Sequence, residues 1–328
     1  MKKYFTEALL ITNNNNKYAI FDWLYWHINI VKFDHIVVID NNSKYNLKSI
    51  CKLFGNNVTY KKINGNISQS EIYTEYVNNS ESWWVLPIDD DEFFYVSDKY
   101  DNNVNTLLYN YAKTYSNTYK FSFNWVMMFS KDLYKSVDLK SDYFNLYNYT
   151  YNTNAINRNN KIMTNEFLNH NKTIVNTLVK HLYIKDTEKT IKVTAKTVNL
   201  KDKINFLNGF DKLGSVHNPI TMFNNKFRHA YNTSDESENI GFFRTKPLNY
   251  DADALIFHFK YRTLDEWNFK TMNRSKFTDL YATYDFDYSP NIIQNIYSYK
   301  NMFKECNIGK ELYNRHKEKI DVIKNELN

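Results

Sequence analysis

Four consecutive acids, Asp89 to Glu92, follow a strongly apolar run in the stretch "WWVLPIDDDEFFYV", residues 83–96. Carboxylates about 4 Å apart repel each other by roughly 4 kcal/mol at an effective dielectric constant of 20. The acids must therefore fan apart into water or hold a cation. Because side chains alternate along a strand, we expect Asp89 and Asp91 on one side and Asp90 on the other. Two carboxylates that face one way suit Mg²⁺ or Mn²⁺, and the alternative is a solvated cluster of turn acids.

A second polar group follows the β-branched run "HIVVID", which ends at Asp40 and leads into Asn41. A carboxylate just past a strand can accept hydrogen bonds from a base imide or a ribose hydroxyl. The alternative for Asp40 is a purely local role in forming the turn.

A third group lies in "ALIFHFKYRTLDEWNFK", where His258 stands between apolar residues and basic side chains follow it. A lone histidine on an apolar strand is usually a core residue. Here Arg262 and Lys270 come soon afterwards, so an imidazole metal ligand with cations beside it could hold a diphosphate leaving group. The alternative for the basic residues is a solvated helix face.

These residues need a scaffold, and the first hundred residues alternate between strand and helix patterns. Such alternation is typical of an α/β fold with a mostly parallel sheet, in which ligands bind at the carboxyl ends of the strands. We expect strands at 7–12, 35–40, 58–63, 83–89, 119–130, 190–200 and 254–259, and helices at 18–33, 47–54, 68–80, 263–277 and 309–328. The polar segment 140–172 reads as a long loop or lid.

The composition restricts the class of protein. The chain has 328 residues, a formal net charge of +6 and scattered lysines, so it does not read as a nucleic-acid-binding protein. Cys51 and Cys306 are the only cysteines, which fits a reducing compartment, and we expect a cytoplasmic protein. No apolar run is long enough to span a bilayer.

Several motifs together resemble the glycosyltransferases of family 92 and the related family-2-like transferases, formerly a domain of unknown function. The segments that carry the resemblance are "DWLYWH", "FDHIVVIDNNS", "IDDDEFF" and, towards the C-terminus, "HFKYRTLDEWNFKTMNRS". A mid-chain Lys-x-Ile-Val motif of the family is matched by Lys172 or by Lys196. The resemblance covers residues 5–130 and 205–275.

The resemblance implies a GT-A fold, a nucleotide-sugar donor and a divalent metal, Mn²⁺ or Mg²⁺. It places Asp40 and Asn41 at the nucleoside, Asp89 at the ribose or donor, and Asp91 at the metal. His258 is then the C-terminal metal ligand.

The resemblance also implies a reaction. We expect a metal-dependent, inverting transfer of a hexosyl group from a UDP-linked donor to a hydroxyl of a glycan or other acceptor. Glu166 and Asp211 are both plausible general bases, and the sequence does not choose between them. Trp125 and His217 are expected on the acceptor side. The alternatives are a metal-dependent nucleotidyltransferase and a non-catalytic carbohydrate-binding protein.

For domain organisation, the sequence predicts one GT-A domain over residues 1–275. Residues 1–100 form its nucleotide-binding half and residues 101–275 its acceptor-binding half. Residues 276–328 form a C-terminal helical extension, which we expect to dock on the body; contact with a second copy or with a membrane is the alternative.

Overall fold

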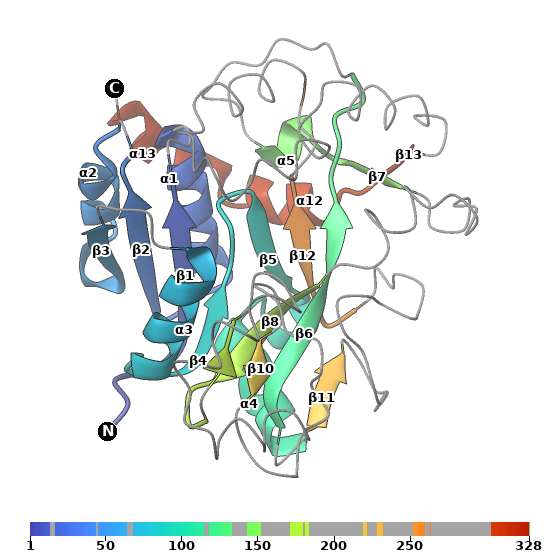
Figure 1. Cartoon of the computed structure of the whole chain (residues 1–328). Helices are drawn as coiled ribbons and strands as arrows, with labels where there is room; N and C mark the ends of the chain where they lie inside the picture. Colours follow the sequence, from blue (N-terminus) through green and yellow to red (C-terminus); the bar gives the residue numbers. More distant parts are fainter. Residues whose placement is uncertain are drawn as a thin grey trace, which may run out of the picture.

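The computed structural model of the chain describes residues 1–13, 17–43, 45–63, 68–114, 118–132, 143–151, 171–179, 181–183, 219–221, 228–231, 252–259, 263 and 303–327. The described part is built around one large sheet with helices on both faces (Figure 1). The expected α/β fold, with a mostly parallel central sheet, flanking helices and a helical C-terminus, is confirmed.

The sheet follows the strand order β3-β2-β1-β4-β8-β6-β12-β5, and β11 also pairs with β6. Most neighbours in it run parallel; β8 is antiparallel to β4 and β6, and β5 is antiparallel to β12. Its strands are β1 (Tyr4–Thr12), β2 (His35–Asn41), β3 (Val58–Ile63), β4 (Ser82–Pro87), β5 (Glu92–Val96), β6 (Thr118–Met127), β8 (Asn171–Asn176), β11 (Arg228–Tyr231) and β12 (Ala254–His258).

The helices begin where the sequence provides a suitable cap. At α3, Ser68 forms a capping box: its side chain accepts from the backbone N–H of Glu71, and the Glu71 carboxylate accepts from the backbone N–H of Ser68. Gly55 has φ +58°, a left-handed conformation that suits glycine at the end of the segment containing α2. The helices of this half are α1 (Lys17–Tyr25), continued by the π-helical turn η1 (Trp26–Ile30), α2 (Leu47–Lys52), the 3₁₀ turn η2 (Gly55–Asn57) and α3 (Gln69–Asn79).

Two apolar clusters fill the space on the two faces of the sheet. Helix α3 contributes Ile72, Tyr73 and Val77 to the smaller one, with Leu9 and Val37 from the sheet. The larger cluster collects buried residues from the sheet and from most other helices. Those other helices are α1, α2, α4 (Val104–Thr114), α5 (Tyr143–Leu146) and α12 (Ile308–Asn314) with α13 (Lys317–Asn325).

Helix α1 is buried on nearly all sides. The expected face, which includes Trp23 of α1 and His27 of η1, is fully buried, but so are Phe21 of α1 and Trp26 of η1 on other sides. The reason is that α1 lies between the sheet and the C-terminal helices α12 and α13 (Figure 1).

Two expectations about the second half of the chain are wrong. Residues 143–151 are not a loop: they form α5 and β7 (Tyr149–Tyr151), and their aromatic residues Tyr143, Phe144 and Tyr147 are buried. The C-terminal segment forms two helices rather than one, and it docks on the body through buried Leu312 and Ile320. Strand β13 (Phe303–Glu305) of the same segment pairs with β7.

The remaining short elements are η3 (Asp98–Tyr100), β9 (His181–Leu182) and β10 (Ile220–Thr221). The expected strand 190–200 and helix 263–277 lie outside the described residues, except for Thr263. The domain boundary at residue 275 also stays a prediction, because residues 264–302 are not described. Within the described residues, no helix combines the length and the apolar character needed to cross a membrane.

Candidate functional site

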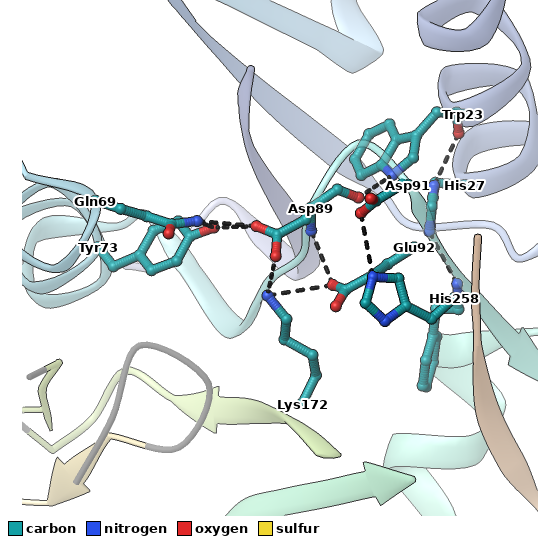
Figure 2. A network of polar contacts seen from close by, with 10 residues as sticks. Trp23, His27, Gln69, Tyr73, Asp89, Asp91, Glu92, Lys172 and His258 are labelled. Carbon is teal, nitrogen blue, oxygen red and sulfur yellow. Dashed lines mark hydrogen bonds and ion pairs between the residues drawn. The ribbon is translucent and has the colours of Figure 1, made fainter. Parts of the chain in front are cut away.

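The carboxyl edge of the sheet gathers the polar residues that the sequence singled out. Strands β2, β4 and β12 all run in the same direction, as the pairings of the strands between them show. Asp40, the acidic run and His258 therefore come to the same edge of the sheet. The antiparallel strands β5 and β8 begin at that edge, and each contributes a charged residue near its start, Glu92 and Lys172. Figure 2 shows how Glu92, Lys172 and His258 lie around Asp89 and Asp91.

The acidic run is a tight turn between β4 and β5, not the end of an extended strand. The backbone N–H of Glu92 donates to the carbonyl of Asp89 at 3.1 Å, which closes the turn. The expected alternation of Asp89 and Asp91 on one side is therefore wrong, because residues 88–91 lie outside both strands. The carboxylates instead point to different neighbours, and Asp90 accepts from the Thr12 hydroxyl at 2.6 Å.

Asp89 is held from two directions. Its Oδ1 accepts from Gln69 Nε2 at 2.9 Å and from the Tyr73 hydroxyl at 3.2 Å, both on α3. Its Oδ2 lies 2.8 Å from the ammonium group of Lys172. The side chain of Asp89 is still 27% exposed, so a ligand hydroxyl can reach it.

Lys172 supplies a cation from within the protein. Its side chain is 1% exposed and its Nζ lies 3.2 Å from Glu92 Oε2, while Glu92 itself is fully buried. Burial lowers the pKa of Lys172, but the carboxylates of Asp89 and Glu92 outweigh it, so the pKa is raised and the ammonium stays charged. Burial raises the pKa of Glu92 well above its ordinary value, and the nearby charges of Asp89 and Asp91 add to this although Lys172 opposes it.

These contacts answer how the chain tolerates four adjacent acids. The carboxylates fan apart in the turn, one ammonium group lies between two of them, and the raised pKa of Glu92 favours a neutral acid. Separation of the carboxylates and pairing with a cation therefore both relieve the repulsion.

Asp91 faces His258. Asp91 Oδ1 lies 3.5 Å from His258 Nε2, and both side chains are almost fully buried. His258 is the register partner of Glu92 on β5, which brings the end of β12 next to the turn. The Trp125 ring packs edge-on against the imidazole with ring centroids 4.3 Å apart, so Trp125 borders the same site.

Asp40 is buried at the edge of the site and also forms a turn with the residues that follow it. Its Oδ1 accepts from the backbone N–H of Ser43 at 2.8 Å, which is the turn-forming role, and its Oδ2 accepts from the Tyr60 hydroxyl at 2.7 Å. Next to it, the buried Asn41 Oδ1 has no hydrogen-bond partner among the residues that the structure describes. Asp40 is the register partner of Thr12, whose hydroxyl binds Asp90, so the two acidic positions are close neighbours.

The donor atoms of Asp91 and His258 fit a divalent cation. Two ligand atoms that each lie about 2.1 Å from one ion are separated by about 3.0 Å at a right angle and about 3.4 Å at the tetrahedral angle. The 3.5 Å between Asp91 Oδ1 and His258 Nε2 agrees with this spacing. No group of three or more such ligands occurs in the described part of the chain, so water and a ligand's phosphates would complete the coordination.

Five predicted site residues lie outside the described residues: Glu166, Asp211, His217, Arg262 and Lys270. Their predicted roles as base, acceptor-side residue and phosphate-binding cations stay predictions.

The structure adds Lys172, Gln69 and Tyr73 to the site. Lys172 had a signal, because it was one of two lysines that matched the Lys-x-Ile-Val motif. Gln69 and Tyr73 had none beyond their place on a helix that leads into the strand before the acids.

No protein-family model matches the chain, and no curated protein matches it. Among solved structures, S. aureus TarS 1-349 in complex with UDP is 14% identical, with a TM-score of 0.31, over 41% of this chain and 38% of that chain. TarS 1-349 alone is 11% identical, with a TM-score of 0.33, over 82% and 64% of the two chains.

A third similar structure is 4-diphosphocytidyl-2C-methyl-D-erythritolsynthase from Anaerococcus prevotii. It is 12% identical, with a TM-score of 0.32, over 72% of this chain and 90% of that chain. This chain spans less than two thirds of the length of the TarS structures. Identities and TM-scores this low leave the function to be judged from the residues of the chain itself.

Proposed function

We propose that this chain is a metal-dependent glycosyltransferase that moves a hexosyl group from a UDP-linked nucleotide-sugar donor to a hydroxyl of a glycan or other acceptor, with inversion. The observation that carries the proposal is the pair Asp91 and His258, 3.5 Å apart at the carboxyl edge of the sheet, beside the Asp89–Lys172 ion pair. In open α/β sheets, ligands bind outside this edge of the sheet.

Each described residue takes a role that its surroundings support. Asp40 and Asn41 face the nucleoside, since both end β2 and the Asn41 carbonyl oxygen is a buried acceptor without a described partner. Asp89 binds the ribose or donor, since its carboxylate is fixed by α3 and Lys172 yet remains accessible. Trp125 borders the acceptor side through its contact with His258.

Asp91 and His258 would hold Mn²⁺ or Mg²⁺. When bound, such an ion neutralises the charge that develops on a departing diphosphate. The protein's own contribution is to keep the imidazole and the carboxylate together in a buried setting, and to keep the charge of Asp89 balanced by Lys172 so that the site does not accumulate repulsion. Arg262 and Lys270 are proposed as further diphosphate partners, and Glu166 or Asp211 as the base that takes the acceptor proton.

The test is binding of UDP with and without Mn²⁺, measured by calorimetry on the wild type and on Asp91→Ala. We expect UDP affinity to depend on Mn²⁺ in the wild type. In Asp91→Ala it should fall at least about tenfold, because water replaces the charged carboxylate as a metal ligand. Asp90→Asn is the matched control: it changes the adjacent carboxylate, which contacts Thr12 instead of His258, and should keep its Mn²⁺ response.

Wild-type Mn²⁺ and UDP affinity in Asp91→Ala would contradict the assignment of the metal site. Donor hydrolysis assayed across nucleotide-sugars then separates the reaction classes. Binding without any Mn²⁺-dependent hydrolysis or transfer would indicate a carbohydrate-binding protein. Release of pyrophosphate from a nucleoside triphosphate would indicate a nucleotidyltransferase.

A further inference from the structure

Helix α1 and the turn η1 hold the acidic turn at both of its ends. Trp23 Nε1 donates to the carbonyl of Asp89 at 2.9 Å, at the start of the turn (Figure 2). Beyond the turn, the backbone N–H of Phe94 donates to His27 Nε2 at 3.2 Å, and Trp26 Nε1 donates to the Phe94 carbonyl at 2.6 Å. These three side chains therefore fix the backbone on either side of Asp90 and Asp91.

In the clamp made by Trp23, Trp26 and His27, the imidazole has one defined protonation state. Since His27 Nε2 accepts a hydrogen bond, its Nδ1–H donates to the carbonyl of Trp23 at 2.8 Å. Burial lowers the pKa of His27 to about 3, although the bond to Trp23 opposes this, so the ring is neutral over the ordinary pH range. The position of the acidic turn thus depends on where α1 lies.

Helix α1 is fastened in turn to the C-terminal helices. Asp22, the residue before Trp23, lies 2.7 Å from Lys324 Nζ and accepts from the Tyr313 hydroxyl at 3.1 Å. The Asp22 and Lys324 side chains are 2% and 7% exposed, so this is a buried ion pair between α1 and α13. A second link joins the same segments, because Lys17 Nζ donates to the carbonyl of Leu327 at 2.7 Å.

A buried ion pair is poor evidence for stabilisation, because desolvation of the two charges can offset their attraction. Its directional contacts nevertheless fix one helix relative to another, which apolar contacts do less specifically. Tyr313 and Leu312 are buried in the same apolar cluster as Trp23, the residue after Asp22. The Asp22–Lys324 ion pair and the Tyr313–Asp22 hydrogen bond are thus directional contacts between α1 and the C-terminal helices.

We propose that Lys324 and Tyr313 are positioning residues for the acidic turn, acting through Asp22 and the clamp of Trp23, Trp26 and His27. The importance of that position for catalysis rests on the proposed function, whereas the mechanical link does not. The C-terminal segment then contributes to the site indirectly, through its contacts with α1.

The test is amide hydrogen exchange in the protein without nucleotide or metal, compared among variants. Lys324→Met leaves a buried carboxylate without its counter-ion, so the double variant Asp22→Asn/Lys324→Met and the milder Tyr313→Phe accompany it in case it does not fold. We expect residues 88–94 to exchange about tenfold faster in the double variant, a change of the size that one lost charged hydrogen bond produces.

Asp253→Asn is the matched control. Asp253 is another partly buried carboxylate, held by Lys99, Tyr100 and Tyr111 near the start of β12 and away from α1. We expect it to lower the melting temperature without selectively speeding exchange at 88–94. Unchanged exchange at 88–94 in the Asp22 and Lys324 variants, or a uniform increase matching the control, would overturn the proposal.

A second readout connects the link to function. In Tyr313→Phe and in the double variant, Mn²⁺-dependent UDP affinity should fall by about tenfold at temperatures where both are fully folded. If the wild type binds neither UDP nor Mn²⁺, the proposed function fails, and the exchange result still decides on the mechanical link. Faster exchange with unchanged affinity would remove the functional part of the proposal.

Discussion

The ammonium group of Lys172 lies next to the carboxylates of Asp89 and Glu92, in a buried position that water hardly reaches. Three carboxylates, counting Asp91, thus share the turn with one internal cation, and the buried Glu92 is the acid whose pKa is raised. When Glu92 carries a proton, the carboxylates of Asp89 and Asp91 together exceed the charge of Lys172 by one. A bound divalent cation would add charge on the Asp91 side, away from Lys172.

Replacing Lys172 by methionine should be strongly destabilising. It leaves Asp89 and Glu92 without their counter-ion, and removing one partner of a buried ion pair costs about 3 to 5 kcal/mol. Urea unfolding at neutral pH measures this loss. Adding Glu92→Gln to Lys172→Met should recover part of it, because a glutamine at this position does not have to take up a proton on folding at neutral pH. No recovery would mean that Lys172 acts by packing alone.

Glu92→Gln tests the raised pKa of Glu92 directly. Between the ordinary pKa of a glutamate and its raised value in the folded protein, only the folded state keeps the proton, so the stabilisation from Glu92 is present at low pH and is lost as pH rises. The variant lacks this loss. Its stability relative to wild type should therefore increase by up to about 1.4 kcal/mol per pH unit above roughly pH 4.5.

The measurement is urea unfolding of Glu92→Gln and wild type side by side at several pH values. Glu311→Gln, on α12 and away from the acidic turn, is the matched control. A stability difference for Glu92→Gln that does not change with pH would show that Glu92 ionises normally.

The sequence predicted the acids of this site better than their partners. Asp40, Asp91 and His258 could be found because each ends or follows a strongly apolar run, and the ends of parallel strands meet at one edge. For the lysine, the sequence left two candidates, Lys172 and Lys196. Nothing local in a sequence marks a lysine that becomes buried because its strand has a neighbour on both sides. The expectation that Asp89 and Asp91 share one side was also wrong, since a closed turn and a continued strand have the same sequence of residue types.

Among the elements, α1 with η1 does most to fix the site, because it contacts the chain before and after the acidic turn. Its indole and imidazole groups bind the Asp89 carbonyl in the turn and the N–H and carbonyl of Phe94 in β5. A buried, neutral histidine in this position gives the element a pH dependence of its own.

His27→Gln should remove a pH-dependent part of the stability. The folded pKa of about 3 lies below the ordinary 6.5, so the unfolded chain binds a proton at pH values where the folded protein does not. The contribution of His27 is thus complete above about pH 6.5 and is lost as pH falls towards 3. Between about pH 7.5 and 5.5 the loss amounts to about 1 kcal/mol.

Urea unfolding at those two pH values measures the change. The wild type should lose about 1 kcal/mol more than His27→Gln on acidification, although the variant is less stable at both pH values because it cannot make both ring contacts. His316→Gln is the comparison: this histidine is only half-buried beside α13, and burial lowers its pKa as well, so its substitution should give a smaller difference of the same sign. Equal losses in wild type and His27→Gln would show that His27 is protonated in the folded protein.

The sequence predicted most helices and strands of the first half of the chain. Strand β3 and the cap of α3 lie where the pattern placed them, because apolar runs, turn residues and an N-cap serine are local signals. Residues 143–151 were misread because α5 and β7 are short and rich in tyrosine and asparagine. What makes them regular is packing against Phe93, Phe257 and the C-terminal segment, which sequence periodicity does not show.

Across the whole molecule, the sheet joins segments that are far apart in the chain. Strand β12 pairs with both β5 and β6, and it carries His258 to within reach of Asp91. The C-terminal helices close over α1 on the face away from α3 (Figure 1). The two candidate metal ligands are thus held by two strands, and the helix that holds the acidic turn is held by the end of the chain.

The insertion of β8 between β4 and β6 matters while the chain is being made. Strand β4 leaves the ribosome with β1 already available on one side, but its other edge has no partner until residues 171–176 follow. Strand β6 emerges earlier and still cannot close that gap, since it pairs with β8 and not with β4. At about 5 to 20 residues per second, the nascent chain spends seconds with an open strand edge that another nascent chain can join. The strand that ends this exposure is also the one that delivers Lys172, so the acidic turn receives its internal counter-ion only when the sheet is closed.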